Sequence, residues 1–161
     1  MEIRFAKPVD LPHIVALERA SFSEAEQISK AVLATYLHYL SKTCLVMETG
    51  GTVIGFVLAC PSQFITVSDS IFHLTPESLP YGAYLSIASL AVSTKYQKQG
   101  IGTLLLAALK EIAVANDYIG ISLTCKEHLV PYYELNQFKD MGPSSSQFGG
   151  RMWYDMYWKP L

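Results

Sequence analysis

The chain has 161 residues, of which 50% are hydrophobic and 16% are charged, and its formal net charge is −2. Such a length suits one domain with a core that needs neither disulfides nor a metal. The charge excludes the basic surface that nucleic-acid binding requires, and no apolar run is long enough to cross a bilayer. We therefore expect a single cytoplasmic domain over residues 1–161, with no nucleic-acid partner and no membrane partner.

The first elements along the chain are predicted to be a strand and two helices. Ile3 and Phe5 alternate with charged residues, as in a short strand. Asp10 is placed to cap a helix that continues to Ala20. Apolar side chains recur at helical spacing over 26–39, which predicts the second helix.

A hairpin and a long loop are expected next. Gly50-Gly51 forms a tight turn between strands at 45–47 and 53–58. Residues 61–82 contain several prolines and little periodicity, so they are predicted to be a loop. Loops of this length in compact domains are usually functional or disordered.

The remaining elements alternate between strands and helices. A strand at 83–92, an apolar helix at 103–115 and a strand at 118–125 form a parallel crossover. A helix at 128–135 precedes strands at 138–141 and 151–158. The predicted fold class is α/β (α+β), with a mixed sheet and helices on both faces.

The segment from Leu90 to Thr103 carries the strongest chemical signal. A strand ends, Gly100 and Gly102 allow a ligand to approach the backbone, and a helix begins immediately afterwards. Free amides and the helix dipole make such a helix start an anion site, to which Lys98 adds a donor. The third glycine of the dinucleotide fingerprint and the P-loop pattern are both missing. The alternative is a glycine pair that only turns the chain.

This segment resembles a family motif. The acetyl-CoA pyrophosphate loop of the GNAT (Gcn5-related N-acetyltransferase) superfamily, Q/R-x-x-G-x-G/A, is similar to Gln97-Lys98-Gln99-Gly100-Ile101-Gly102. The resemblance implies a mostly antiparallel sheet of about six to seven strands. It also implies acetyl-CoA as cosubstrate, held by the residues Leu90, Ala91, Val92, Gln97, Lys98, Gln99, Gly100, Ile101, Gly102 and Thr103.

A second segment, from Leu129 to Phe138, resembles the family's xxFYxxxGF pattern, although Gln137 stands where the family has glycine. Tyr133 takes the position whose phenol lies near the coenzyme sulfur, and this implies a catalytic role. When an amine attacks the thioester, a phenol can protonate the leaving thiolate, and a backbone amide near Leu90 can polarise the carbonyl. The alternative for Tyr133 is a packing role with a satisfied hydroxyl.

Within the superfamily, the pattern is most similar to the arylalkylamine (serotonin) N-acetyltransferases. The similarity includes Glu18 to Phe22 and Cys125 to Tyr133. That family carries an HxH pair that removes the amine proton, but Ser86 and Ala88 occupy those positions here. Neither can act as a base, so the proton route differs or runs through water.

Candidates for the acceptor site lie in loops. Glu24 and Glu26, between the first two helices, are placed to meet an ammonium group, with solvated charges as the alternative. Aromatic residues that would line an apolar amine pocket are Phe22, Phe64, Phe72, Tyr81, Tyr84 and Phe148. Surface positions are expected for all four histidines, His13, His38, His73 and His128.

The three cysteines, Cys44, Cys60 and Cys125, are widely spaced in hydrophobic surroundings, which predicts buried, reduced thiols. No His/Cys spacing suggests a metal site, and no metal is expected. Cys125 ends a predicted buried strand without a paired histidine, which argues against a cysteine nucleophile.

The sequence therefore predicts an acetyl-CoA-dependent N-acetyltransferase that acts by direct transfer to a primary amine, a small aryl or alkyl amine. Three alternatives remain: a protein N-terminal or lysine acetyltransferase, a non-catalytic acyl-CoA-binding module, and an interaction domain unrelated to CoA. The apolar composition is compatible with a homodimer.

Overall fold

Seven strands form one sheet in the computed structural model, which describes residues 1–161. In chain order the strands are β1 (Glu2–Phe5), β2 (Cys44–Thr49), β3 (Thr52–Ser62), β4 (Tyr84–Val92), β5 (Ile121–Cys125), β6 (Lys139–Pro143) and β7 (Tyr154–Trp158). The helices are α1 (Leu11–Ser21), α2 (Lys30–Tyr39), α3 (Ile101–Ala115) and α4 (Val130–Leu135). None of these helices combines the length and apolar character needed to cross a bilayer.

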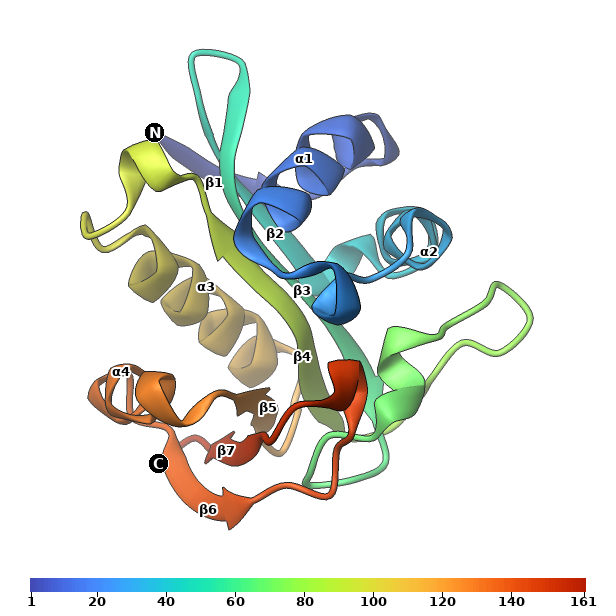
Figure 1. The fold of residues 1–161 in the computed structure, drawn as a ribbon, viewed down its shortest axis with the longest axis vertical. Helices are drawn as coiled ribbons and strands as arrows, with labels where there is room; N and C mark the ends of the chain where they lie inside the picture. Colours follow the sequence, from blue (N-terminus) through green and yellow to red (C-terminus); the bar gives the residue numbers. More distant parts are fainter.

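The sheet has the order β1-β2-β3-β4-β5-β7-β6, and only β4 and β5 are parallel neighbours. Figure 1 shows α1 and α2 on one face of the sheet and α3 and α4 on the other. The prediction of a mixed, mostly antiparallel sheet with helices on both faces is therefore confirmed.

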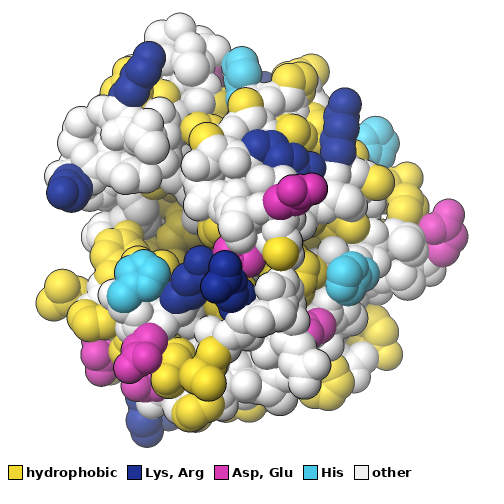
Figure 2. Space-filling model, viewed as in Figure 1, with side chains coloured by type: hydrophobic (Ala, Val, Ile, Leu, Met, Phe, Trp, Pro, Cys, Tyr) yellow, Lys and Arg dark blue, Asp and Glu magenta, His cyan; other side chains and the backbone are white.

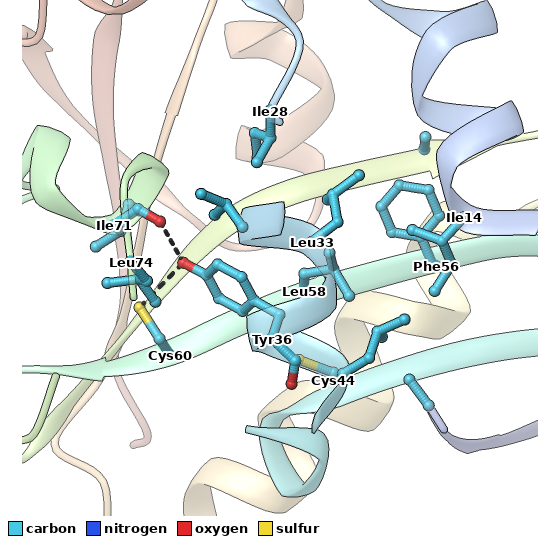
Figure 3. Packing of buried hydrophobic residues seen from close by; sticks show 14 of the residues in the cluster. Ile14, Ile28, Leu33, Tyr36, Cys44, Phe56, Leu58, Cys60, Ile71 and Leu74 are labelled. Atoms are coloured by element: carbon cyan, nitrogen blue, oxygen red, sulfur yellow. Dashed lines mark hydrogen bonds between the residues drawn. The ribbon is translucent and has the colours of Figure 1, made fainter. Parts of the chain in front are cut away.

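Each face of the sheet has its own hydrophobic core, because successive strand residues point to opposite sides. In β2, Val46 packs in the core under α1 and α2, whereas Leu45 and Met47 pack in the core under α3. Figure 3 shows Tyr36 of α2 in the first core, with its hydroxyl donating to the Ile71 carbonyl at 2.7 Å. This hydrogen bond anchors the long loop that follows β3 to the core.

The sheet splits between β4 and β5. Ala88 is an extra residue in β4, because Ser89 pairs with Leu58 whereas Ile87 pairs with Ala59. Such a bulge bends its strand. The two parallel strands pair only at Leu85–Ile121 and Ser86–Ser122, and Figure 1 shows them diverging beyond that point. The backbone of β4 beyond residue 87 therefore has no strand partner on this side.

Several predicted boundaries differ from the structure. The second helix begins at Lys30 rather than residue 26, because the Ser29 hydroxyl accepts from the Val32 amide and caps it there. Residues 24–26 form a separate 3-10 turn. The predicted strand 118–125 begins only at Ile121, and the predicted helix 128–135 is a 3-10 turn followed by α4.

The hairpin and the buried thiols agree with the sequence analysis. Gly50 and Gly51 have φ of +54° and +78°, the left-handed conformation that a tight turn between β2 and β3 requires. The three cysteines, Cys44, Cys60 and Cys125, are all free and buried.

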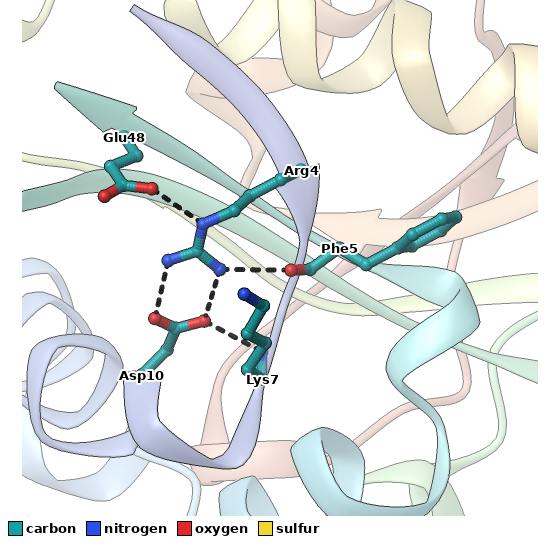
Figure 4. A network of polar contacts seen from close by, with 5 residues as sticks. All are labelled: Arg4, Phe5, Lys7, Asp10 and Glu48. Atoms are coloured by element: carbon teal, nitrogen blue, oxygen red, sulfur yellow. Dashed lines mark hydrogen bonds and ion pairs between the residues drawn. The ribbon is translucent and has the colours of Figure 1, made fainter. Parts of the chain in front are cut away.

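Asp10 is at the start of α1, as expected, but its side chain does not cap the helix. Its carboxylate instead accepts two hydrogen bonds from the Arg4 guanidinium, at 2.8 and 2.9 Å, and one from the Lys7 amide at 2.8 Å (Figure 4). Arg4 also donates to Glu48 at 2.7 Å. Instead of capping α1, Asp10 is thus part of a charged network that joins β1, β2 and the start of α1.

Candidate functional site

A cavity of about 580 Å³ lies where the sheet splits, beside the start of α3. Nine of the ten residues expected to hold acetyl-CoA line it, namely Leu90, Ala91, Val92, Gln97, Lys98, Gly100, Ile101, Gly102 and Thr103. Gln99 does not line it. The structure thus gathers on one wall the residues that the sequence places on a strand, a loop and a helix.

The loop before α3 leaves its amides free for a ligand. No backbone amide of residues 98–103 donates to an acceptor in the protein. Gly100 has φ of +79° and Lys98 has φ of +62°, so the chain makes a left-handed turn into the helix. The Gln97 side-chain amide donates to the Val92 carbonyl at 3.1 Å and holds the loop against the end of β4. This arrangement fits an anion such as a pyrophosphate.

Gly102 allows α4 to approach the start of α3. A Cβ atom at Gly102 would lie 2.5 Å from the Tyr132 hydroxyl oxygen, which is too close for a real contact. Tyr132 also lines the cavity, opposite the end of β4. The second glycine of the motif therefore has a packing role as well as leaving room for a ligand.

A second cavity, of about 220 Å³, adjoins the first; the first is termed the phosphate-side cavity and the second the acceptor cavity. Ser21, Phe22, Leu90, Leu129 and Tyr133 line both. Figure 2 shows a hollow in this face of the molecule, with hydrophobic side chains inside and basic side chains beside it. The shared lining joins the two cavities into one site.

Tyr133 lies at the junction of the two cavities. It is 9% exposed and packs edge-on against Tyr132 and Phe138, at ring distances of 5.1 and 5.9 Å. Burial, and to a lesser degree nearby Cys125, raise the pKa of Tyr133 above its ordinary range. The ring is held by packing, whereas the hydroxyl makes no hydrogen bond within the protein and stays protonated.

The model of the acetyltransferase (GNAT) family matches residues 11–136. The chain belongs to this family. The resemblance of the loop at 97–102 to the GNAT superfamily is thereby confirmed. Comparison with curated protein sequences gives no match.

Solved structures share the fold over nearly the whole chain. They include the GphF GNAT-like decarboxylase in complex with isobutyryl-CoA, with a TM-score of 0.79, 17% identity and 99% coverage of both chains. The ribosomal-protein-alanine N-acetyltransferase from Brucella melitensis has a TM-score of 0.73 at 19% identity, covering 99% of this chain and 100% of that one. The diaminobutyrate acetyltransferase EctA from Paenibacillus lautus, in complex with its substrate and coenzyme A, has a TM-score of 0.69 at 18% identity, covering 99% and 94%. Their activities differ, so the GNAT fold alone does not identify a substrate.

In this GNAT chain, the bulge in β4 changes which side chain faces the acceptor cavity. Ser86 is fully buried and its hydroxyl lies 2.8 Å from that of Ser122. Ala88 and Ser89 both line the cavity, and the Ser89 hydroxyl is buried without a partner. Sequence reasoning missed Ser89, because the bulge that turns it toward the cavity has no sequence signal.

Two carboxylates line the acceptor cavity, and each is already paired. Glu18 is fully buried, and its oxygens accept from Arg19 at 2.5 Å and from the Ile28 amide at 2.9 Å. Burial raises the pKa of Glu18. Glu26 lies 2.8 Å from the Lys126 ammonium and accepts from the Ser23 hydroxyl. Burial opposes ionisation of Glu26, but these two partners lower its pKa.

Glu24 is exposed and lies outside the cavity, so the structure brings only one of the two expected carboxylates to the site. Glu18 and Lys126 were missed as members of the site. A carboxylate on an otherwise apolar helix face is the one sequence signal that marks Glu18.

Aromatic side chains form part of the cavity wall. Phe22, Phe72 and Phe148 line it as expected, and Phe72 stacks on Phe148 at 4.1 Å. Trp153 also lines it and was missed. The other three expected aromatics, Phe64, Tyr81 and Tyr84, do not line it, and Phe64 and Tyr81 are exposed. These three lie on the far part of the long loop and at the start of β4.

The loop between β6 and β7 covers the acceptor cavity. Asp69 accepts from the Ser146 hydroxyl at 2.5 Å and from the Gln147 amide at 3.1 Å. A Cβ atom at Gly149 would lie 2.9 Å from the Ala25 carbonyl oxygen, so this loop rests directly on the loop between α1 and α2 (Figure 1). Three loops that are distant in sequence therefore meet over the site.

The remaining nucleophile and metal candidates do not form a site. Cys125 lines the cavity, but burial raises the pKa of its thiol to about 12. All four histidines are exposed, including His128 at the cavity edge. No group of three or more His, Cys, Asp or Glu side chains is placed to hold a metal ion.

Proposed function

We propose that this GNAT protein transfers the acetyl group of acetyl-CoA to the primary amine of a small molecule. The observation that carries the proposal is the position of Tyr133, which lines both the phosphate-side cavity and the acceptor cavity and whose protonated hydroxyl makes no hydrogen bond within the protein. A donor at this junction can reach a reacting thioester that is bound from one side and attacked from the other.

The residues present fit acetyl-CoA. The unpaired amides of residues 98–103 and the Lys98 ammonium would hold the pyrophosphate. The unpaired edge of β4, at residues 88–92, would hydrogen-bond the amides of the pantetheine arm as a further strand would. Acetyl-CoA supplies the activated thioester. The chain's backbone would supply hydrogen bonds to both the pyrophosphate and the pantetheine arm.

Tyr133 would act as the general acid. Its raised pKa keeps the proton on the hydroxyl through the neutral range, so it can be donated to the departing sulfur. Neither Ser86 nor Ala88 can take the proton from the amine, and Ser89 can only accept a hydrogen bond from it. The two carboxylates of the cavity, Glu18 and Glu26, are already paired with Arg19 and Lys126, so we assign proton removal to water in the cavity.

A small acceptor is favoured over a protein because the cavity is covered. The loop at 144–150 rests on the loop between α1 and α2 and so narrows the acceptor side of the site. The aromatic wall of Phe22, Phe72 and Phe148 suits the aryl or alkyl part of an amine.

The test is CoA release from acetyl-CoA with a panel of aryl amines, alkyl amines, amino acids and short peptides. Turnover on small amines and none on peptides is the expected result. Turnover on peptides alone would identify a protein acetyltransferase instead. Saturable acetyl-CoA binding with no turnover on any compound would favour the non-catalytic acyl-CoA-binding module.

A further inference from the structure

The acceptor cavity carries an ion pair that crosses it from wall to wall. Glu26 comes from the loop between α1 and α2, and Lys126 directly follows β5, on the other side of the split. Glu26 is 3% exposed, and the two charged groups are 2.8 Å apart. Arg151, which follows the covering loop, adds a second positive charge that acts on Glu26. Figure 2 shows basic side chains next to an acidic one beside the hollow.

The charged side chains around this cavity include at least as many positive as negative groups. Glu18 is matched by Arg19, and Glu26 is matched by Lys126, with Arg151 in addition. To bind Glu26, a simple alkylammonium ion would have to displace the Lys126 ammonium group. Lys126 would then have no partner of opposite charge and would lie next to the bound alkylammonium ion. Like charges placed together in a partly buried site are unfavourable.

A zwitterion avoids this cost. We propose that the acceptor carries a carboxylate close to its amine, so that it is an amino acid or a related zwitterion. Its ammonium group takes the place of Lys126 at Glu26, and its carboxylate binds Lys126. Both members of the protein's ion pair then keep a partner of opposite charge.

The buried Ser89 hydroxyl gives this acceptor a third contact. Ser89 is 5% exposed and lines the cavity, and its hydroxyl is buried without a partner in the protein. A buried hydroxyl without a partner is unfavourable, and an amine bound at Glu26 can donate to it. This contact would orient the nitrogen toward the junction at Tyr133, where it attacks the thioester after the ammonium group has lost a proton to water in the cavity.

This inference rests on the proposed acetyl transfer and is tested with matched pairs of acceptors. Each pair is an amino acid and the amine that remains without its carboxylate: L-phenylalanine and 2-phenylethylamine, L-leucine and 3-methylbutylamine, and L-2,4-diaminobutyrate and 1,3-diaminopropane. CoA release gives kcat/KM for both members. We expect at least one pair in which kcat/KM for the amino acid exceeds that of the amine by about 10- to 100-fold.

The variant Lys126→Met keeps the length of the side chain and removes its charge. It should lower the amino acid-to-amine ratio of kcat/KM by about 10- to 100-fold, whereas Lys42→Met, outside the cavity, should leave the ratio unchanged. A purely structural ion pair would instead lower both values together at a constant ratio, and that result would overturn the inference.

The outcomes also separate this inference from the proposed function. If the wild type accepts the amines as well as or better than the amino acids, acetyl transfer stands and the zwitterion assignment is wrong. If no pair is turned over while acetyl-CoA binds, both are wrong.

Discussion

Tyr133 is held by its packing, and its hydroxyl is the part left free for chemistry. Tyr133→Phe keeps the ring contacts with Tyr132 and Phe138. We expect kcat to fall about 100-fold, with the Kd of acetyl-CoA unchanged within about twofold, because only proton transfer is lost. Steady-state CoA release and calorimetric titration measure the two quantities. Tyr154→Phe, at a partly buried tyrosine of β7 that lines neither cavity, is the control, and unchanged turnover in Tyr133→Phe would exclude its role as the acid.

Gly100 provides the matching test on the coenzyme side. Gly100→Asp places a carboxylate among the free amides, where it would repel the pyrophosphate, so acetyl-CoA binding should weaken by at least about 100-fold. Gly51→Asp is a close control, since φ is +78° at Gly51 and +79° at Gly100, and neither site has an atom within 4 Å of a new Cβ. Both variants carry similar backbone strain, and calorimetric titration compares their affinities. Wild-type affinity in Gly100→Asp would remove the loop from the coenzyme site.

At the scale of elements, β1 and α1 depend on the network around Asp10. The Arg4 guanidinium is the main cause of a lowered pKa at Asp10. The ionised Asp10 carboxylate therefore stabilises the fold fully at pH values above its unfolded-state pKa of about 3.9. This stabilisation disappears as the pH falls through the lower folded-state pKa of Asp10. Asp10→Asn should lower the free energy of unfolding by about 2 kcal/mol at neutral pH.

Urea unfolding of Asp10→Asn and wild type at several pH values measures this difference. It should begin to shrink as the pH falls below about 4, where Asp10 of the unfolded chain takes up a proton, and should vanish below the lower folded-state pKa. Exposed Glu77→Gln should show no such pattern. A difference that does not change with pH would mean that the charge of Asp10 is not what stabilises this corner.

The long loop after β3 depends on Tyr36. Tyr36→Phe removes the donor to the buried Ile71 carbonyl and should lower the free energy of unfolding by about 1–3 kcal/mol. Because Phe72 follows Ile71 and lines the acceptor cavity, KM for the amine should rise more than that for acetyl-CoA. Thermal unfolding and initial rates test both effects against Tyr39→Phe, an exposed tyrosine on the same helix. Equal stability of the two variants would contradict the role given to this bond.

The elements could be predicted from sequence where periodicity and turn residues agree. The Gly50-Gly51 turn, the apolar helix before β5 and the loop at 97–102 all follow from local patterns. The start of α2 could not be predicted, because apolar spacing continues upstream of the Ser29 cap. Asp10 was wrongly predicted to cap α1, because the Arg4 side chain that binds its carboxylate comes from the preceding strand.

The acceptor side of the site was less predictable for a related reason. Its walls come from α1, from β4 and β5 and from three loops, so their meeting depends on tertiary structure. Ser89 faces the cavity only because of the bulge at Ala88, and Lys126 belongs to the site only because it meets Glu26 across the split. The coenzyme side was predicted more fully because its residues are contiguous in the sequence.

At the scale of the whole molecule, the split between β4 and β5 creates the site. The strands pair only near Leu85 and Ser86, and the phosphate-side and acceptor cavities both open where they separate. The two halves of the sheet remain joined at that end, and loops cover the acceptor side. The fold thus provides one cavity beside the start of α3 and an adjoining smaller one under the loops.

Hydrogen–deuterium exchange with and without acetyl-CoA tests this placement most directly. The account predicts slower exchange of the amides at 98–103, along the unpaired edge of β4 and around Tyr133, because the bound coenzyme supplies their missing acceptors or covers them. A rival cavity of about 530 Å³ lies between α2 and the loop at 74–76. Protection confined to that cavity, or no protection at all, would contradict the coenzyme site described here.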